Sequence, residues 1–168
     1  MKNFIKSLLT AALLFTAQAS HAEKPNIWFS GTGQGFTAYI IKNNGITVDI
    51  SCNYASMPSY DHSIIISRYN PKTRSDEEIF TFADNKGDGE FIIDGISYYP
   101  STPTDTDFSS GEWRRFTVAM SKARKFEIKI KEKTVAVFTP KPKSVKDVAA
   151  EMKQCEDMIT LRNTIFRE

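Results

Sequence analysis

The sequence is poor in histidine and cysteine, which limits the chemistry that its side chains can perform. The chain has two histidines and two cysteines among 168 residues. A zinc site built on histidines needs more ligands than this. No G-x-S-x-G element is present to carry a serine nucleophile. A Ser-His-Asp arrangement that uses His62 stays open, since its members meet only in space.

Beyond its first residues, the sequence also lacks any long apolar run. Two lysines near the start precede a short, mostly apolar segment over residues 7–15, and residues 19–22 supply small side chains at the −3 and −1 positions of a cleavage site. The apolar segment is shorter than the roughly 20 residues that a membrane-spanning helix needs. We therefore predict a signal peptide over residues 1–22 and a mature single domain over residues 23–168 with no membrane span.

An excess of charge of one sign is missing as well. The 22 basic residues nearly balance the 20 acidic ones, and the predicted signal peptide contains two of the lysines. The near-neutral mature chain gives no reason to expect nucleic-acid binding. However, residues 61–112 carry 11 acids and 4 bases, whereas residues 113–146 carry 2 acids and 11 bases. These blocks either form oppositely charged faces that attract a partner or neutralise each other across the fold.

The two cysteines, Cys52 and Cys155, are predicted to form one disulfide. An exported protein enters an oxidising compartment, where an isolated cysteine pair is bonded by default. The pair lacks the C-x-x-C spacing of a redox or zinc site. We expect a bridge between an early strand and the C-terminal segment, in preference to free thiols, a metal pair or an intermolecular bond.

Alternating apolar residues predict antiparallel hairpins. The turn sequences Asn43-Asn44-Gly45 and Asp94-Gly95 each separate two strand-like segments. A third hairpin is expected over residues 126–137, with its turn near Glu132-Lys133. Apolar and polar residues alternate from Ile46 to Cys52, so Cys52 should face inward.

Two helices are expected after most of the strands. Ser109-x-x-Glu112 has capping-box spacing and precedes an apolar stripe that consists of Trp113, Phe116, Ala119, Met120 and Ala123. Ser144-x-x-Asp147 begins a C-terminal helix that places Cys155 on its buried side. The fold class is therefore α+β and dominated by strands: antiparallel sheet or sheets built from hairpins, two helices, one of them C-terminal, and a single disulfide.

One acidic segment superficially matches the start of a calcium loop. Residues 84–90 contain three acids and two glycines, but Lys86 occupies a ligand position and Gly95 stands where a bidentate glutamate is required. A polar turn is the better interpretation. We predict no metal and no cofactor.

Loop tyrosines are the candidate binding residues, because tyrosine anchors protein interfaces and stacks on sugars. We select Tyr54 and Tyr60 from one segment, and from another Tyr98 and Tyr99, together with two acids of the following polar loop, Asp105 and Asp107. The alternative is that these tyrosines are half-buried strand residues. The two acids, or alternatively Glu77 and Glu78, are also the remaining catalytic candidates, although no glycosidase motif surrounds them.

The C-terminal half contains, in order, Trp113-x-x-Phe116-x-x-Ala119-Met120, a strand over residues 126–130, Thr134-Val135-Ala136-Val137-Phe138 and a final helix with Cys155. This order resembles the ending of VasI/TagO-like type VI secretion accessory proteins and of invasion-associated-locus-B-like proteins. Pro140 and Pro142 depart from the continuous connection to the helix in those groups. The resemblance implies an exported accessory or binding domain and transfers no functional residues.

We predict a non-enzymatic periplasmic or secreted protein that binds an envelope or foreign protein, as a secretion accessory, a hydrolase inhibitor or an immunity protein does. The alternative is a small-molecule or glycan-binding domain, or a weak hydrolase that uses loop carboxylates. A deep, aromatic-lined cleft with converging polar groups would favour the alternative. A shallow charged patch would favour protein binding.

Export makes a direct prediction about the covalent structure. Non-reducing mass spectrometry of the exported protein should show an N-terminus at Glu23 and a mass two protons below that of the reduced chain. An intact N-terminus or two free thiols would contradict the prediction of an oxidising compartment.

Overall fold

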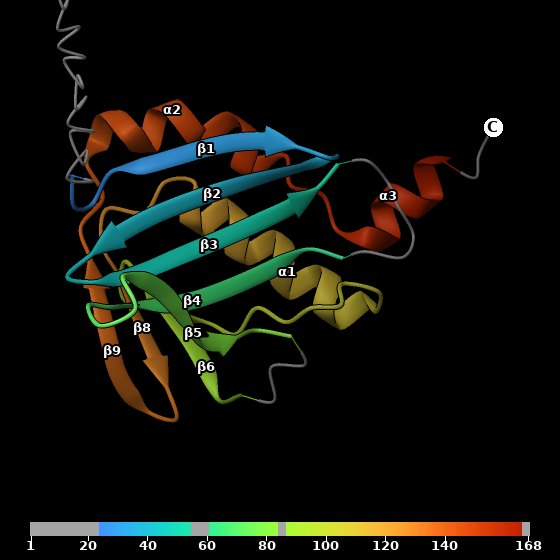
Figure 1. The fold of residues 1–168 in the computed structure, drawn as a ribbon. Helices are drawn as coiled ribbons and strands as arrows, with labels where there is room; N and C mark the ends of the chain where they lie inside the picture. The colour runs from blue at the N-terminus through green and yellow to red at the C-terminus, as the bar shows by residue number, and fades with distance from the viewer. Residues whose placement is uncertain (1–23, 55–60, 84–86, 166–168) are drawn as a thin grey trace, which may run out of the picture.

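The computed structural model describes residues 24–54, 61–83 and 87–165, and in these residues it contains two antiparallel sheets and three helices (Figure 1). The predicted α+β, strand-dominated fold class is confirmed. The predicted signal peptide, Tyr60 and the start of the predicted polar turn at residues 84–90 lie outside the described residues.

The first sheet is a meander in which each strand pairs with the next along the chain. Its strands are β1 (Trp28–Gly33), β2 (Phe36–Asn43), β3 (Ile46–Asn53), β4 (Ser63–Asn70) and β5 (Ser75–Thr81). Asn44 and Gly45 both have positive φ between β2 and β3, as a two-residue hairpin requires. The prediction that Ile46, Val48, Ile50 and Cys52 face inward is confirmed, since all four are buried.

The second sheet has the order β7-β6-β8-β9 and receives α1 between its second and third strands along the chain. Its strands are β6 (Gly89–Ile93), β7 (Ile96–Tyr98), β8 (Phe126–Ile130) and β9 (Lys133–Phe138). The predicted Asp94-Gly95 turn joins β6 to β7 with positive φ at both residues. The third hairpin turns at Lys131 and Glu132, one residue earlier than predicted, because no glycine marks its centre.

The helices are α1 (Asp107–Met120), α2 (Pro142–Lys153) and α3 (Met158–Ile165). The predicted capping box at Ser109 and Glu112 is wrong, because Thr106 caps α1 and Ser109 occupies the third helical position. The Thr106 hydroxyl accepts from the Ser109 N–H at 3.1 Å, and the Ser109 hydroxyl accepts from the Thr106 N–H at 3.2 Å. Serine thus takes the role that glutamate usually has in this motif.

The predicted start of the C-terminal helix at Ser144 is also wrong. The helix begins at Pro142, whose fixed φ suits the first turn, and no side chain caps it. The Ser144 hydroxyl instead donates to the Lys141 carbonyl at 2.9 Å.

The predicted single C-terminal helix is divided into α2 and α3. Asp157 lies just before α3, and its carboxylate accepts from the Thr160 N–H at 3.0 Å, as a helix cap does. Cys155 therefore lies in the connection between the two helices. The periodicity of apolar residues continues through this break, so it could not reveal the cap.

Both sheets, α1 and α2 contribute to one hydrophobic core. The predicted apolar stripe of α1 is confirmed: Trp113, Phe116, Ala119, Met120 and Ala123 are all buried. In Figure 1, α1 lies behind the first sheet and α2 runs along β1. Aromatic contacts connect the layers, with Phe91 at 5.0 Å from Phe82 and 4.9 Å from Phe116 between ring centroids. Phe91 of β6 thus connects α1 to Phe82, which follows β5.

The predicted disulfide between Cys52 and Cys155 is confirmed and joins the end of β3 to the α2–α3 connection. None of the helices in the described part of the chain has the length and apolar content that a membrane crossing requires.

Replacement of Cys155 by serine should lower the free energy of unfolding by about 2–5 kcal/mol, because it opens a long cross-linked loop. Urea unfolding at neutral pH measures this loss. Wild-type protein in a reducing agent is the matched control and should lose a similar amount, while the variant should not respond to the reducing agent. An unchanged urea midpoint in Cys155→Ser would contradict a stabilising role for the bridge.

Candidate functional site

Exposed apolar side chains cluster where the outer face of α1 passes β7. Phe108 is 75% exposed, Ile96 60%, Tyr99 45% and Val118 36%. They line two adjoining depressions of about 620 and 390 Å³, both bordered by Arg115. We name this region the β7–α1 surface and define it by Ile96, Tyr98, Tyr99, Asp105, Phe108, Arg115, Val118 and Lys122.

The helical repeat explains why α1 contributes three residues to this surface. Phe108, Arg115 and Val118 recur at intervals of seven and three, so they share one side of the helix, and Lys122 follows just after its end. The buried stripe with Trp113 occupies the opposite side and faces the core. Fixing the inner stripe therefore determines which side chains α1 presents to solvent.

The side chain of Tyr99 is fixed by a hydrogen-bond network on the second sheet. Its hydroxyl donates to Glu90 at 3.0 Å, and the Ser97 hydroxyl donates to the same carboxylate at 2.6 Å. The Ser97 bond is the main reason that the pKa of Glu90 is lowered, with help from Tyr99 and from the charge of Lys129. The hydrogen bond between Tyr99 and Glu90 raises the pKa of the Tyr99 hydroxyl. The Tyr99 ring is thus held in one orientation before any partner binds.

The loop between β7 and α1 is anchored by hydrogen bonds of Thr104, which is fully buried. Asp61 accepts from the Thr104 N–H at 2.9 Å and from its hydroxyl at 3.1 Å. The Ser110 hydroxyl donates to the Thr104 carbonyl at 3.0 Å, and the Met158 N–H donates to the Thr104 hydroxyl at 3.0 Å. Asp105 is consequently an exposed residue on a rigidly mounted loop.

The predicted binding residues fall into separate groups. Tyr99 and Asp105 line the larger depression, and Tyr98 lines the smaller one. Asp107 is exposed at the first position of α1 but lines neither depression.

Tyr54 lies elsewhere and contributes to packing. Its hydroxyl donates to the Glu151 carbonyl of α2 at 3.0 Å and lies 3.1 Å from the Tyr39 hydroxyl. Tyr54 thereby connects the end of the first sheet to α2. Tyr60 is outside the described residues.

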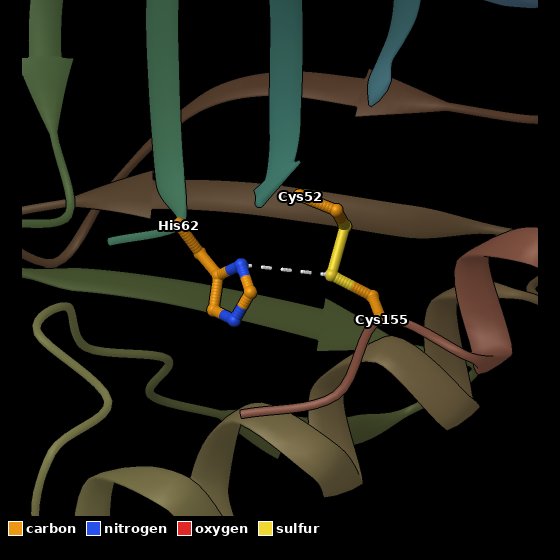
Figure 2. Close-up of side chains that lie close together, drawn as sticks. All are labelled: Cys52, His62 and Cys155. Atoms are coloured by element: carbon orange, nitrogen blue, oxygen red, sulfur yellow. Dashed lines mark hydrogen bonds between the residues drawn. A yellow bond between two sulfur atoms is a disulfide. The ribbon is translucent and has the colours of Figure 1, made fainter. Parts of the chain in front are cut away.

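The other chemically notable cluster surrounds the disulfide (Figure 2). His62 is 3% exposed, its Nδ1 accepts from the Asn53 N–H at 3.0 Å, and its ring stacks on Trp113 at 4.6 Å. Nδ1 also lies 3.9 Å from the Cys155 sulfur. His62, Cys52 and Cys155 have the side chains of a metal site, with potential ligand atoms within 4.8 Å of one another. The sulfurs are bonded to each other, however, so they offer no thiolate to a metal.

Burial places the predicted histidine candidate for acid–base chemistry, His62, beneath the surface. His62 is covered by Trp113 and the disulfide, away from the β7–α1 surface. It therefore contributes to the core, and the absence of an enzymatic activity stays a prediction.

A model of the YfjT family matches residues 26–149 of this chain. The chain belongs to the YfjT family. It is 26% identical over 158 residues to the uncharacterized protein YfjT of Escherichia coli K12. This alignment covers 90% of the present chain and 97% of YfjT. It is 24% identical over 155 residues to the uncharacterized protein YkfB of the same strain. This alignment covers 89% of the present chain and 94% of YkfB. No solved structure matches.

The YfjT match includes Cys52 and the whole β7–α1 surface. The resemblance to secretion accessory and invasion-associated proteins stays a prediction beside it.

Sequence reasoning missed five residues of this surface in the YfjT-family chain: Ile96, Phe108, Arg115, Val118 and Lys122. A signal was present for two of them: Phe108 and Val118 are large apolar residues that fall outside the predicted buried stripe of α1. An apolar residue on the polar side of an amphipathic helix is a candidate contact residue.

The buried histidine predicts a specific pH dependence of stability. Burial lowers the pKa of His62 below the usual 6.5, and the Asp61 and Asp157 carboxylates and the Glu156 backbone only partly oppose it. The unfolded chain therefore gains a proton before the folded chain does as the pH falls. The contribution of neutral, buried His62 to the free energy of unfolding is complete above pH 6.5. Below that pH it is lost, by no more than about 1.4 kcal/mol per pH unit.

Urea unfolding of wild type and His62→Gln between pH 7 and 5 checks this dependence. Glutamine retains a hydrogen-bond acceptor but does not titrate, so the variant should show the shallower decline. Equal slopes for the two proteins would refute the assignment to His62. The histidine at position 21 is common to both proteins and cancels in the comparison.

Proposed function

We propose that this YfjT-family protein is an exported, non-enzymatic binding protein that contacts an envelope or foreign protein through the β7–α1 surface. The observation that carries the proposal is the concentration of exposed apolar side chains on one rigid face. Phe108 is the most exposed large apolar residue in the described part of the chain. Continuous apolar surface of this kind is characteristic of interaction sites.

The composition of the surface supports a protein partner. Tyr99, Phe108 and Arg115 belong to the residue types that most often dominate the binding energy of interfaces. Asp105 and Lys122 add charges at the border, where they would influence association rate and specificity. A pre-oriented ring such as that of Tyr99 loses little conformational entropy on binding.

The shape of the surface distinguishes this proposal from a small-molecule site. The two depressions are open and adjoin along α1 instead of forming one deep cleft with converging polar groups. A surface of this shape is better suited to side chains of a partner protein than to enclosure of a small ligand.

Two features support export. The Cys52–Cys155 disulfide is stable in an oxidising compartment. The first 22 residues have the composition of a signal peptide. The periplasm, or the medium after secretion, is the compartment that agrees with both.

The test is capture of a stoichiometric partner from periplasmic extract, followed by affinity measurement with surface variants. Phe108→Ser and Arg115→Glu should each weaken binding about tenfold or more, since a central anchor contributes about 2 kcal/mol. Phe29→Ser is the matched control because Phe29 is 46% exposed on β1. It should bind like wild type.

The pattern of loss decides the outcome. Wild-type affinity in Phe108→Ser and Arg115→Glu, or an equal loss in Phe29→Ser, would refute the β7–α1 surface as the contact site. Recovery of no protein partner, together with saturable binding to a glycan, would replace the proposal by the glycan-binding alternative.

A further inference from the structure

A second hollow, separate in chemistry from the β7–α1 surface, lies where the end of α1 meets the start of α2. It is a groove of about 610 Å³ with walls from residues 121–124, residues 139–142 and the first turns of α2. Figure 1 shows that β9 leads directly into α2, which brings the second and third walls together. The groove borders the β7–α1 surface at Lys122.

The floor of the groove is apolar and made of small side chains. Ala123 and Pro140 are buried, and Val145 and Ala149 are half-buried. Because these side chains are short, they leave space between the helices. An apolar group that enters this space would displace water from apolar surface.

The wall over residues 139–142 is fixed without any ligand. The Thr139 N–H donates to the Asn26 side chain at 2.9 Å, and the Lys141 N–H donates to the Asn26 carbonyl at 2.8 Å. The groove is therefore formed in advance, which lowers the entropy cost of binding.

The rim of the groove is cationic. Lys122, Arg124, Lys141 and Lys146 line it and are exposed, and no acidic residue is among the described lining residues. Arg124 has a long ion pair of 3.8 Å with Asp94. Within residues 24–54, 61–83 and 87–165, the three lysines make no ion pair, so three positive charges line the same groove without an ion-pair partner.

Helix ends modify this field. α2 begins at Pro142 in the groove wall, and the positive end of its dipole adds to the lysines. The negative end of α1 acts in the opposite direction, but Lys122 and Arg124 directly follow it. The groove is therefore electropositive above an apolar floor.

We infer that this groove binds an anionic amphiphile from solution, with one apolar chain on the floor and a phosphate or carboxylate head group between the lysines. Opposite charge at the rim favours the acidic head group. The apolar floor favours a ligand with a chain over a simple anion. This function goes beyond the proposed protein binding, and Lys122 is the one described residue that lines both the groove and the β7–α1 surface.

The first experiment is isothermal titration calorimetry of the protein with octyl phosphate at low and high salt. Octanol and inorganic phosphate are the matched controls, since each has one half of the ligand. Octyl phosphate should bind with 1:1 stoichiometry, more tightly than either half, and should weaken as salt is added because exposed charges are screened.

The second experiment locates the ligand. The double variant Lys141→Glu, Lys146→Glu should weaken octyl phosphate binding about tenfold or more through charge reversal. Lys72→Glu, Lys133→Glu is the matched control, because it changes the net charge equally at exposed lysines outside the groove. Ala149→Phe should also weaken binding by filling the floor, and thermal unfolding verifies that each variant is folded.

Four results would overturn the inference. The first is an equal loss of octyl phosphate affinity in the site and control double variants, and the second is an affinity for inorganic phosphate or octanol equal to that for octyl phosphate. The third is binding only to vesicles with phosphatidylglycerol, and the fourth is binding only to an acidic peptide. Phe108→Ser should retain wild-type affinity for octyl phosphate, so failure of this inference and failure of the proposed function are distinguishable.

Discussion

The attachment of residues 154–158 to α1 and to the first sheet is the constraint on which the other features depend. Cys155 is covalently bonded to Cys52 of β3, and its carbonyl accepts from the Trp113 indole N–H at 3.1 Å. Two residues later, Asp157 accepts from the Ser110 hydroxyl at 2.8 Å and pairs with Arg114 at 3.3 Å. The bonds to α1 act on its inner side, so they set the rotation of the helix as well as its position.

The rotation of α1 determines the candidate binding surface. With Trp113 directed to the core, Phe108 and Val118 have no buried position available and are presented to solvent. The same buried polar network holds the loop before α1, because Thr104 is bonded to Asp61, to Ser110 and to the Met158 N–H. The buried polar groups around Thr104 are thus hydrogen-bonded, as stability requires. Phe108 and Val118 are exposed, which stability alone does not favour.

The unequal charge blocks of the sequence are partly paired and partly unpaired in the fold. Some charges neutralise each other across the fold, as in the pairs Lys129–Glu90 at 3.6 Å and Arg124–Asp94 at 3.8 Å. Others remain together, because Lys122, Lys141 and Lys146 meet at the groove between α1 and α2. The small formal net charge of +2 therefore conceals a local electropositive site.

The sequence by itself determined the features that depend on near neighbours or on simple counting. These are the Asn-Gly and Asp-Gly hairpins, the inward face of β3, the buried stripe of α1 and the pairing of two lone cysteines. Tertiary structure decided that Tyr54 packs against α2 and that Glu90 orients Tyr99. It also decided that Asp157 divides the last helix and which lysines line one groove. Most of these depend on contacts between residues far apart in sequence, and the Asp157 cap is a local contact that the continuing apolar periodicity conceals.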